Sequence, residues 1–186
     1  MENQILDNNL LKNDTNQPKW AGFWIRVGAT LIDILVYLPL IGLNMYNLYV
    51  LKSLPLQLII TAIMLAYKPF MEYKYGATLG KMAVKIKVVN SNLESISLGQ
   101  SIIRYSPWLL GQVFSIIGTV LLFQHSDFEI ASGMMEMGLL QQEVISPIYN
   151  YISSAVLLIS VVVVAFQAKK QGLHDLLAGT YCIYTN

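Results

Sequence analysis

The chain has 186 residues, of which 55% are hydrophobic and 12% are charged, and its formal net charge at pH 7 is +1. Soluble domains contain about twice this share of charged residues, so the composition excludes an ordinary soluble domain and predicts a polytopic membrane protein. No basic cluster typical of nucleic-acid binding is visible, and the single cysteine, Cys182, excludes an intrachain disulfide.

After a polar start, the chain divides into long apolar segments. Residues 1–19 lack the basic start and apolar core of a signal peptide, so we expect a flexible cytosolic tail. Residues 20–186 form one predicted transmembrane domain, because most of their apolar side chains fall in segments that can cross a hydrocarbon core of roughly 30 Å. The predicted spans cover about 23–43, 54–73, 102–123 and 148–166.

Prolines lie in three of these spans. Pro39 is near the far end of the first span, and Pro107 is in the first predicted turns of the third, where a missing N–H costs little. Lys68 and Pro69 interrupt the second span, so whether it crosses the membrane completely stays open. The fourth span carries no charge and has the strongest membrane-spanning signal.

The distribution of lysine and arginine predicts the orientation. The connection between the second and third spans is basic, whereas residues 124–146 contain no Lys or Arg and are acidic. Basic connections usually face the cytosol, and Lys169 and Lys170 place the end of the fourth span on that same side. We therefore expect a multi-pass protein of the plasma (inner) membrane, with both termini in the cytosol and the acidic loop outside.

Two strand-like segments flank the later spans. Apolar residues alternate with others from Met82 to Val89, and residues 180–184 are also strand-like. If the two segments pair, they form a small sheet at the cytosolic membrane surface, with Asp175 near residues 76–81. The predicted fold class is an all-α polytopic membrane protein with about four transmembrane helices and a small cytosolic interfacial β-pair.

A glycine-rich segment precedes the first of these strands. Its candidate site residues are Gly76, Thr78, Gly80 and Lys81. A nucleotide-binding phosphate loop would need a longer gap between the glycines and a Ser or Thr after the lysine, which are missing here. The simpler interpretation is that the glycines allow a turn at the interface while the lysines face anionic lipid head groups.

These features resemble the RDD family of bacterial membrane proteins, which is named for one arginine and two aspartates. Arg26 matches the arginine that opens the first helix, Asp33 the first aspartate, and Asp175 the second, within the closing segment 173–180. The resemblance covers roughly residues 20–184, except for the acidic stretch 124–146. It implies transport of unidentified ligands, with sodium/proton exchange suggested for some members.

The charged residues of the first span need partners. Arg26 and Asp33 are about 10 Å apart along the helix axis, too far for unstrained contact, but Arg26 can extend to the interface and pair with Asp175 there. Asp33 lies deeper, where a charged side chain costs about 2.5–3.5 kcal/mol unless it is compensated. Arg104 is the predicted partner of Asp33, because Gly111 on the same span allows close helix packing.

Two functions fit this cluster. In the first, Asp33 binds Na⁺ or H⁺ in a cation/proton exchanger, which at this size would form a homo-oligomer or use a membrane-protein partner. In the second, Arg26, Asp33, Arg104 and Asp175 form a structural network in a membrane scaffold or accessory subunit. No enzyme is expected, because the aspartates lack the flanking sequence of intramembrane aspartic proteases and no nucleophile motif is present.

The acidic stretch 124–146 raises one metal hypothesis. Its methionines, Met134, Met135 and Met137, with His125, are the kind of residues that bind Cu(I). Methionines among apolar residues and a few acids are more simply explained as an amphipathic segment on the outer membrane interface. We therefore expect no metal and no cofactor.

Overall fold

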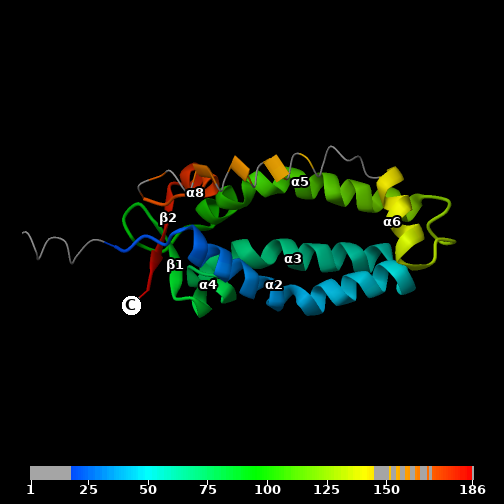
Figure 1. Cartoon of the computed structure of the whole chain (residues 1–186), viewed down its shortest axis with the longest axis horizontal. Coiled ribbons are helices and arrows are strands. Elements are labelled where there is room, and N and C mark those ends of the chain that lie inside the picture. Colours follow the sequence, from blue (N-terminus) through cyan, green and yellow to red (C-terminus); the bar gives the residue numbers. More distant parts are fainter. Residues whose placement is uncertain are drawn as a thin grey trace, which may run out of the picture.

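The computed structural model describes residues 18–144 and 169–185, together with 151, 154–155, 158–159, 162–163 and 167. Its long helices lie side by side along one axis, and a small sheet closes one end (Figure 1). The elements in chain order are α2 (Phe23–Tyr46), the π-helical η1 (Asn47–Leu51), α3 (Leu54–Tyr75), α4 (Leu79–Ala83), β1 (Ile86–Asn90), α5 (Leu98–Gln124), α6 (Gly133–Val144), α8 (Leu173–Ala178) and β2 (Thr180–Tyr184).

Among the described residues, two helices are long and apolar enough to cross a membrane, namely α2 continued by η1, and α3. A third is α5, if its two parts, Leu98–Leu109 and Gly111–Gln124, which meet at 58°, form one span. The predicted interruption at Lys68 and Pro69 is wrong, because α3 is continuous through both residues. The predicted fourth span, 148–166, lies largely outside the described residues.

The third helix starts earlier than hydropathy predicted. The side chain of Ser97 accepts a hydrogen bond from the N–H of Gln100, whose side chain binds back to Ser97, and this capping box starts α5 at residue 98. Pro107 is therefore an interior residue, and its predicted place in the first turns is wrong. Because proline has no N–H, Pro107 leaves the carbonyl of Ile103 without its helical donor. The hydroxyl of Ser106 donates to that carbonyl instead, at 2.7 Å.

The predicted β-pair is confirmed. β1 and β2 are antiparallel, with Val88 opposite Cys182, and Trp20 adds an isolated bridge to Ile183. The first strand begins later than the alternation predicted, because residues 79–83 form the short helix α4. The start of α2 and strand β2 therefore lie together, on the same side of the bundle as α4 and α8 (Figure 1).

The long helices expose apolar side chains and bury polar ones. On α2, Leu31 and Leu35 are 59% and 63% exposed, whereas Asp33 between them is 3% exposed. On α5, Phe114 is 52% exposed and Arg104 is 3% exposed. This pattern is the reverse of a soluble protein and suits helices whose outer surface meets lipid.

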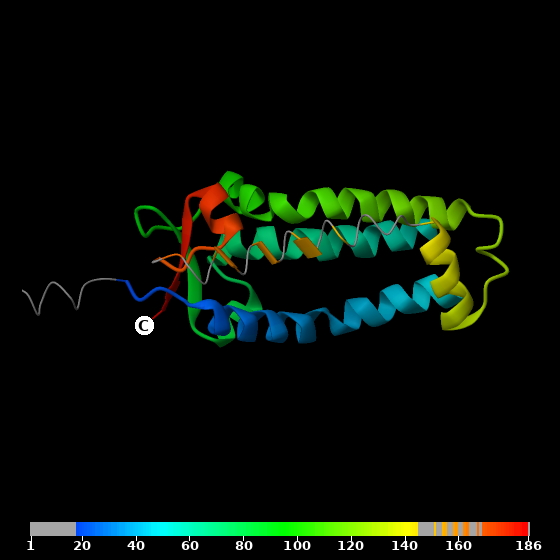
Figure 2. The same ribbon diagram turned by 45° about the horizontal axis from the view of Figure 1, so that its top comes forward.

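The opposite end of the bundle is closed by α6, which crosses it in Figure 2. The acidic stretch 124–146 thus contains a helix, and its Met137 and Leu140 pack with Phe128 in a buried apolar cluster. The ammonium of Lys52 donates to three backbone carbonyls of residues 128–131 at 2.7–3.0 Å. The connections at this end are therefore held in place by both apolar packing and hydrogen bonds.

Candidate functional site

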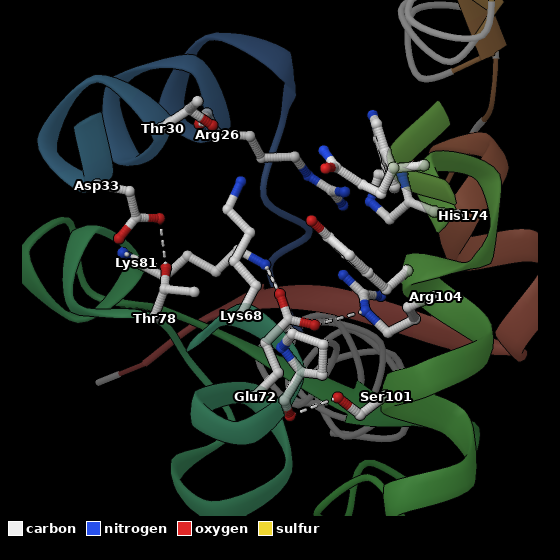
Figure 3. Close-up of a pocket in the computed structure, with 14 residues that line it drawn as sticks. Arg26, Thr30, Asp33, Lys68, Glu72, Thr78, Lys81, Ser101, Arg104 and His174 are labelled. Carbon is white, nitrogen blue, oxygen red and sulfur yellow. Dashed lines mark hydrogen bonds and ion pairs between the residues drawn. The ribbon is translucent and has the colours of Figure 1, made fainter. Parts of the chain in front are cut away.

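A cavity of about 230 Å³ lies where α2, α3, α4, α5 and α8 meet, beside the sheet (Figure 3). Charged side chains from four of these elements line it. They are the cations Arg26, Lys68, Lys81 and Arg104 and the carboxylates Asp33 and Glu72. Most of the residues that the sequence singled out are therefore gathered around one space, although they come from positions 26 to 104 of the chain.

Asp175 joins two arginines behind this cavity. It is fully buried, and its carboxylate pairs with the guanidinium groups of Arg26 and Arg104 and accepts the N–H of Gly172 at 3.0 Å. Burial alone would raise the pKa of the Asp175 carboxyl, but the charge of Arg104, with His174 and Arg26, holds that pKa below its usual range. The Arg26–Asp175 pair predicted from the sequence forms, in the interior and not at the surface.

Glu72 extends this pairing toward the glycine-rich segment. Arg104 donates its Nε–H to Glu72 at 2.9 Å, and the other carboxylate oxygen pairs with Lys81. Arg104 also donates to the hydroxyl of Thr180 at 2.5 Å. Glu72 was missed by the sequence reasoning, although it is the only acidic residue between positions 33 and 94. Its isolation among lysines was the signal that could have identified it.

Asp33 is held by neutral donors. Its oxygens accept from the hydroxyl of Thr78 at 2.7 Å, the N–H of Gly80 at 2.8 Å and the hydroxyl of Tyr67 at 3.1 Å. The predicted Asp33–Arg104 pair is wrong, because Arg104 is already bound to two carboxylates and the oxygens of Asp33 are filled by these donors. Asp33 therefore attaches α4 to α2.

Gly80 has to be a glycine for this attachment. A Cβ atom built on it would lie 2.0 Å from the carbonyl oxygen of Ala29, far inside normal contact. Gly76 has a separate role, since its φ of +71° turns the chain out of α3. The hydroxyl of Thr78 caps α4 by accepting the N–H of Lys81 at 3.3 Å. The predicted signature residues thus place α4 against Asp33.

Comparison with known proteins identifies the family of this chain. The model of the RDD family matches residues 20–179. The chain belongs to the RDD family. It is 33% identical over 129 residues to the uncharacterized protein YxaI of Bacillus subtilis (strain 168), covering 56% of this chain and 85% of YxaI. It is 28% identical over 171 residues to the uncharacterized protein YckC of the same strain, covering 91% of this chain and 87% of YckC. No solved structure matches significantly.

His174 of this RDD protein lies beside Trp108, with ring centroids 5.1 Å apart, and its Nε2 is 3.5 Å from Asp175. Burial, only partly offset by the carboxylate of Asp175, lowers the pKa of His174 to about 3. The imidazole is therefore neutral at physiological pH.

A second cavity of about 430 Å³ continues from the first toward the far end of the RDD domain. The two cavities share Lys68, Tyr105 and Gln112. Polar side chains such as Thr61 and Ser115 line the second cavity. Within the described residues, no group of three or more His, Cys, Asp or Glu is arranged to hold a metal ion.

Proposed function

We propose that this RDD protein has a transport-related function and that the cavity beside Asp33 is where it handles its solute or ion. The observation that supports the proposal is the charged cavity inside helices whose outer side chains are apolar. Ionisable groups are costly within a membrane and usually mark ion or substrate pathways. The second cavity shares residues with the first, so together they would extend such a pathway along the bundle.

Cation/proton exchange at Asp33 is the form of transport that we propose first. Asp33 lines the cavity and is also the acceptor that holds Thr78 and Gly80 of α4. A proton on Asp33 would remove the negative charge that these donors bind, so α4 would be held less tightly over the cavity. A proton and Na⁺ would compete for one carboxylate, and α4 would act as the closing element.

The proposed topology places both termini in the cytosol. Supporting it, the basic segment around α4 and β1, the start of α2 and strand β2 lie at the same end of the molecule (Figure 1). Lysines at this end would face anionic lipid head groups. Because few spans are available for a complete carrier, we propose that the protein works as a homo-oligomer or with a membrane-protein partner.

A structural role as scaffold or accessory subunit is the second candidate, without enzymatic activity. It is favoured by the paired charges, since Asp175 and Glu72 each bind two cations. Breaking such a network is costly, so it can serve to fix the packing of α3, α5 and α8. In that case the carboxylate of Asp33 would be needed for folding and not for exchange.

An exchange assay in proteoliposomes separates the two candidates. Purified protein would be reconstituted with an internal pH dye and exposed to Na⁺, K⁺ or Li⁺, and compared with Asp33→Asn at matched incorporation. Cation-triggered pH recovery that disappears in the variant is the expected result. No exchange by either protein would refute cation/proton exchange, and loss of the variant from the membrane would favour the structural role.

A further inference from the structure

Lys68 differs from the other cations of the cavity. Arg26, Arg104 and Lys81 each pair with a carboxylate. Lys68, which is half-buried in the wall shared by the two cavities, makes neither a hydrogen bond nor an ion pair within the part of the chain that the structure describes. Its ammonium group extends into the space between the charged residues in Figure 3.

Four cations, Lys68 among them, share three carboxylates at this cavity once Asp175 is included, so one positive charge is in excess. The titratable groups that act on Lys68 are Lys81, Asp33 and Glu72. Asp33 accepts from Thr78 and Gly80, and Glu72 pairs with two other cations, so both carboxylates attract Lys68 without contacting it. Lys81 repels Lys68. A bound anion would remove this repulsion and supply the missing counter-charge.

Gln112 offers further donors at the same place. It comes from α5 and, like Lys68 of α3, lines both cavities. Its side-chain amide has two N–H donors and makes no hydrogen bond within the described residues. Next to these polar groups, Pro69 and Trp108 give the cavity an apolar wall.

We propose that Lys68 and Gln112 bind a small oxyanion, a carboxylate or phosphate group, in this cavity. The ammonium supplies the charge, the amide supplies a directional N–H donor, and the apolar wall accepts an organic substituent. The cavity of about 230 Å³ is many times larger than the roughly 10–15 Å³ that one water needs. This inference rests on the proposed transport-related function, because it names a solute class that the same cavity would take, separate from the cation exchange proposed at Asp33.

An oxyanion can reach the cavity from two sources. A free solute would enter from water, whereas the phosphate of an anionic phospholipid would enter from the bilayer, whose head groups lie near the sheet end in the proposed topology. Both sources present the same chemistry to Lys68. The experiment therefore includes one arm for each.

Thermal unfolding of the purified full chain in neutral detergent measures the binding. One arm titrates sodium benzoate or sodium phosphate against sodium chloride at equal ionic strength, and the other adds phosphatidylglycerol against phosphatidylcholine. A ligand at about 100 times its Kd should raise the Tm by about 5–10 °C. The rise should saturate in at least one arm, and the responding arm identifies the source.

Three variants make the result specific. Lys68→Met should lose the ligand-dependent rise in Tm, and Gln112→Leu should reduce the apparent affinity about tenfold or more, as expected for a lost hydrogen bond to a charged group. Lys74→Met removes the same charge from an exposed position of α3 and should respond like the unmodified chain. In chloride alone, Lys68→Met should unfold at or above the Tm of the unmodified chain, because the positive charge in excess is removed.

Several results would overturn the proposal. They are no saturable shift in either arm, an unchanged shift in Lys68→Met, or a lower Tm of that variant in chloride, which would show that Lys68 already has a stabilising partner. Binding is measured without an ion gradient. Failure of the exchange assay therefore leaves the oxyanion site intact, and failure of binding leaves cation/proton exchange to be judged by its own assay.

Discussion

Replacement of Gly80 by alanine tests how α4 is attached to the bundle. The added Cβ would lie 2.0 Å from the carbonyl oxygen of Ala29 and within 3.0 Å of the side chain and N–H of Asp33. All of these atoms belong to α2, and two are backbone atoms that cannot rotate away. We expect α4 to move outward, so that the Gly80 N–H loses its 2.8 Å hydrogen bond to Asp33.

The magnitude follows from three contributions. Overpacking costs about 1–3 kcal/mol, and a hydrogen bond to a charged carboxylate contributes about 1.5–3 kcal/mol. Alanine returns up to about 1 kcal/mol because it favours the helix more than glycine does. The net loss of about 2–4 kcal/mol should lower the Tm of a chain of this size by about 5–15 °C, measured by tryptophan fluorescence in detergent.

Gly28→Ala is the matched control. Gly28 lies on α2 directly before Ala29, and nothing is within 4 Å of the position that its Cβ would occupy. The same chemical change should therefore leave the Tm unchanged or raise it slightly. If Gly80→Ala and Gly28→Ala unfold at the same temperature, α4 is not held by close approach to α2, and the role assigned to Gly80 is wrong.

Three further predictions concern the buried polar groups. Thr78→Val removes a hydroxyl that both caps α4 and donates to Asp33, so it should cost about 1–3 kcal/mol in thermal unfolding, whereas Thr78→Ser should stay close to the unmodified chain. Asp175→Asn leaves Arg26 and Arg104 short of a counter-charge and should lower the free energy of unfolding by about 3–5 kcal/mol. The variant should therefore accumulate less in membranes. Full accumulation with an unchanged Tm would contradict this prediction. The folded-state pKa of His174, about 3, is below the unfolded value of 6.5, so the unfolded chain binds the extra proton between these values and stability falls as the pH drops below 6.5. At pH 5 the resulting loss of folding free energy is up to about 2 kcal/mol. His174→Gln lacks this loss, so its Tm should depend less on pH between 7 and 5. An equal slope in both proteins would count against a buried neutral imidazole.

Much of the fold could be predicted because it depends on local patterns. The first two helices extend the predicted spans by only a few residues, and the pairing of the two strand-like segments was correct. The errors came from local signals that hydropathy does not register. The capping box at Ser97 starts α5 in a polar sequence, and Thr78 starts α4 where alternation suggested a strand nearby. Both helix starts depend on a side-chain hydrogen bond and not on apolar content.

Most residues of the candidate site could be predicted from the sequence, but several of their contacts could not. The free-energy cost of burying the Asp33 carboxylate requires that it has partners. That cost does not decide whether the partner is an arginine or a group of neutral donors. The three donors come from α3 and α4, and they meet Asp33 only because Gly80 lets α4 approach α2 closely. Glu72 and Lys68 were not assigned roles, because their importance depends on which charges are left after Arg104 is placed.

Transport through this bundle requires that water can enter the polar cavity enclosed by helices whose outer side chains are apolar. The adjacent residues Thr30 and Leu31 test it directly, since Thr30 lines the cavity and Leu31 is an exposed apolar residue of the same helix. Each would be replaced by cysteine in a Cys182→Ser background and treated in proteoliposomes with a charged, membrane-impermeant thiol reagent. We predict rapid labelling at position 30 and protection at position 31. Equal protection of both positions would contradict a hydrated cavity, and equal labelling of both would contradict the lipid-facing surface.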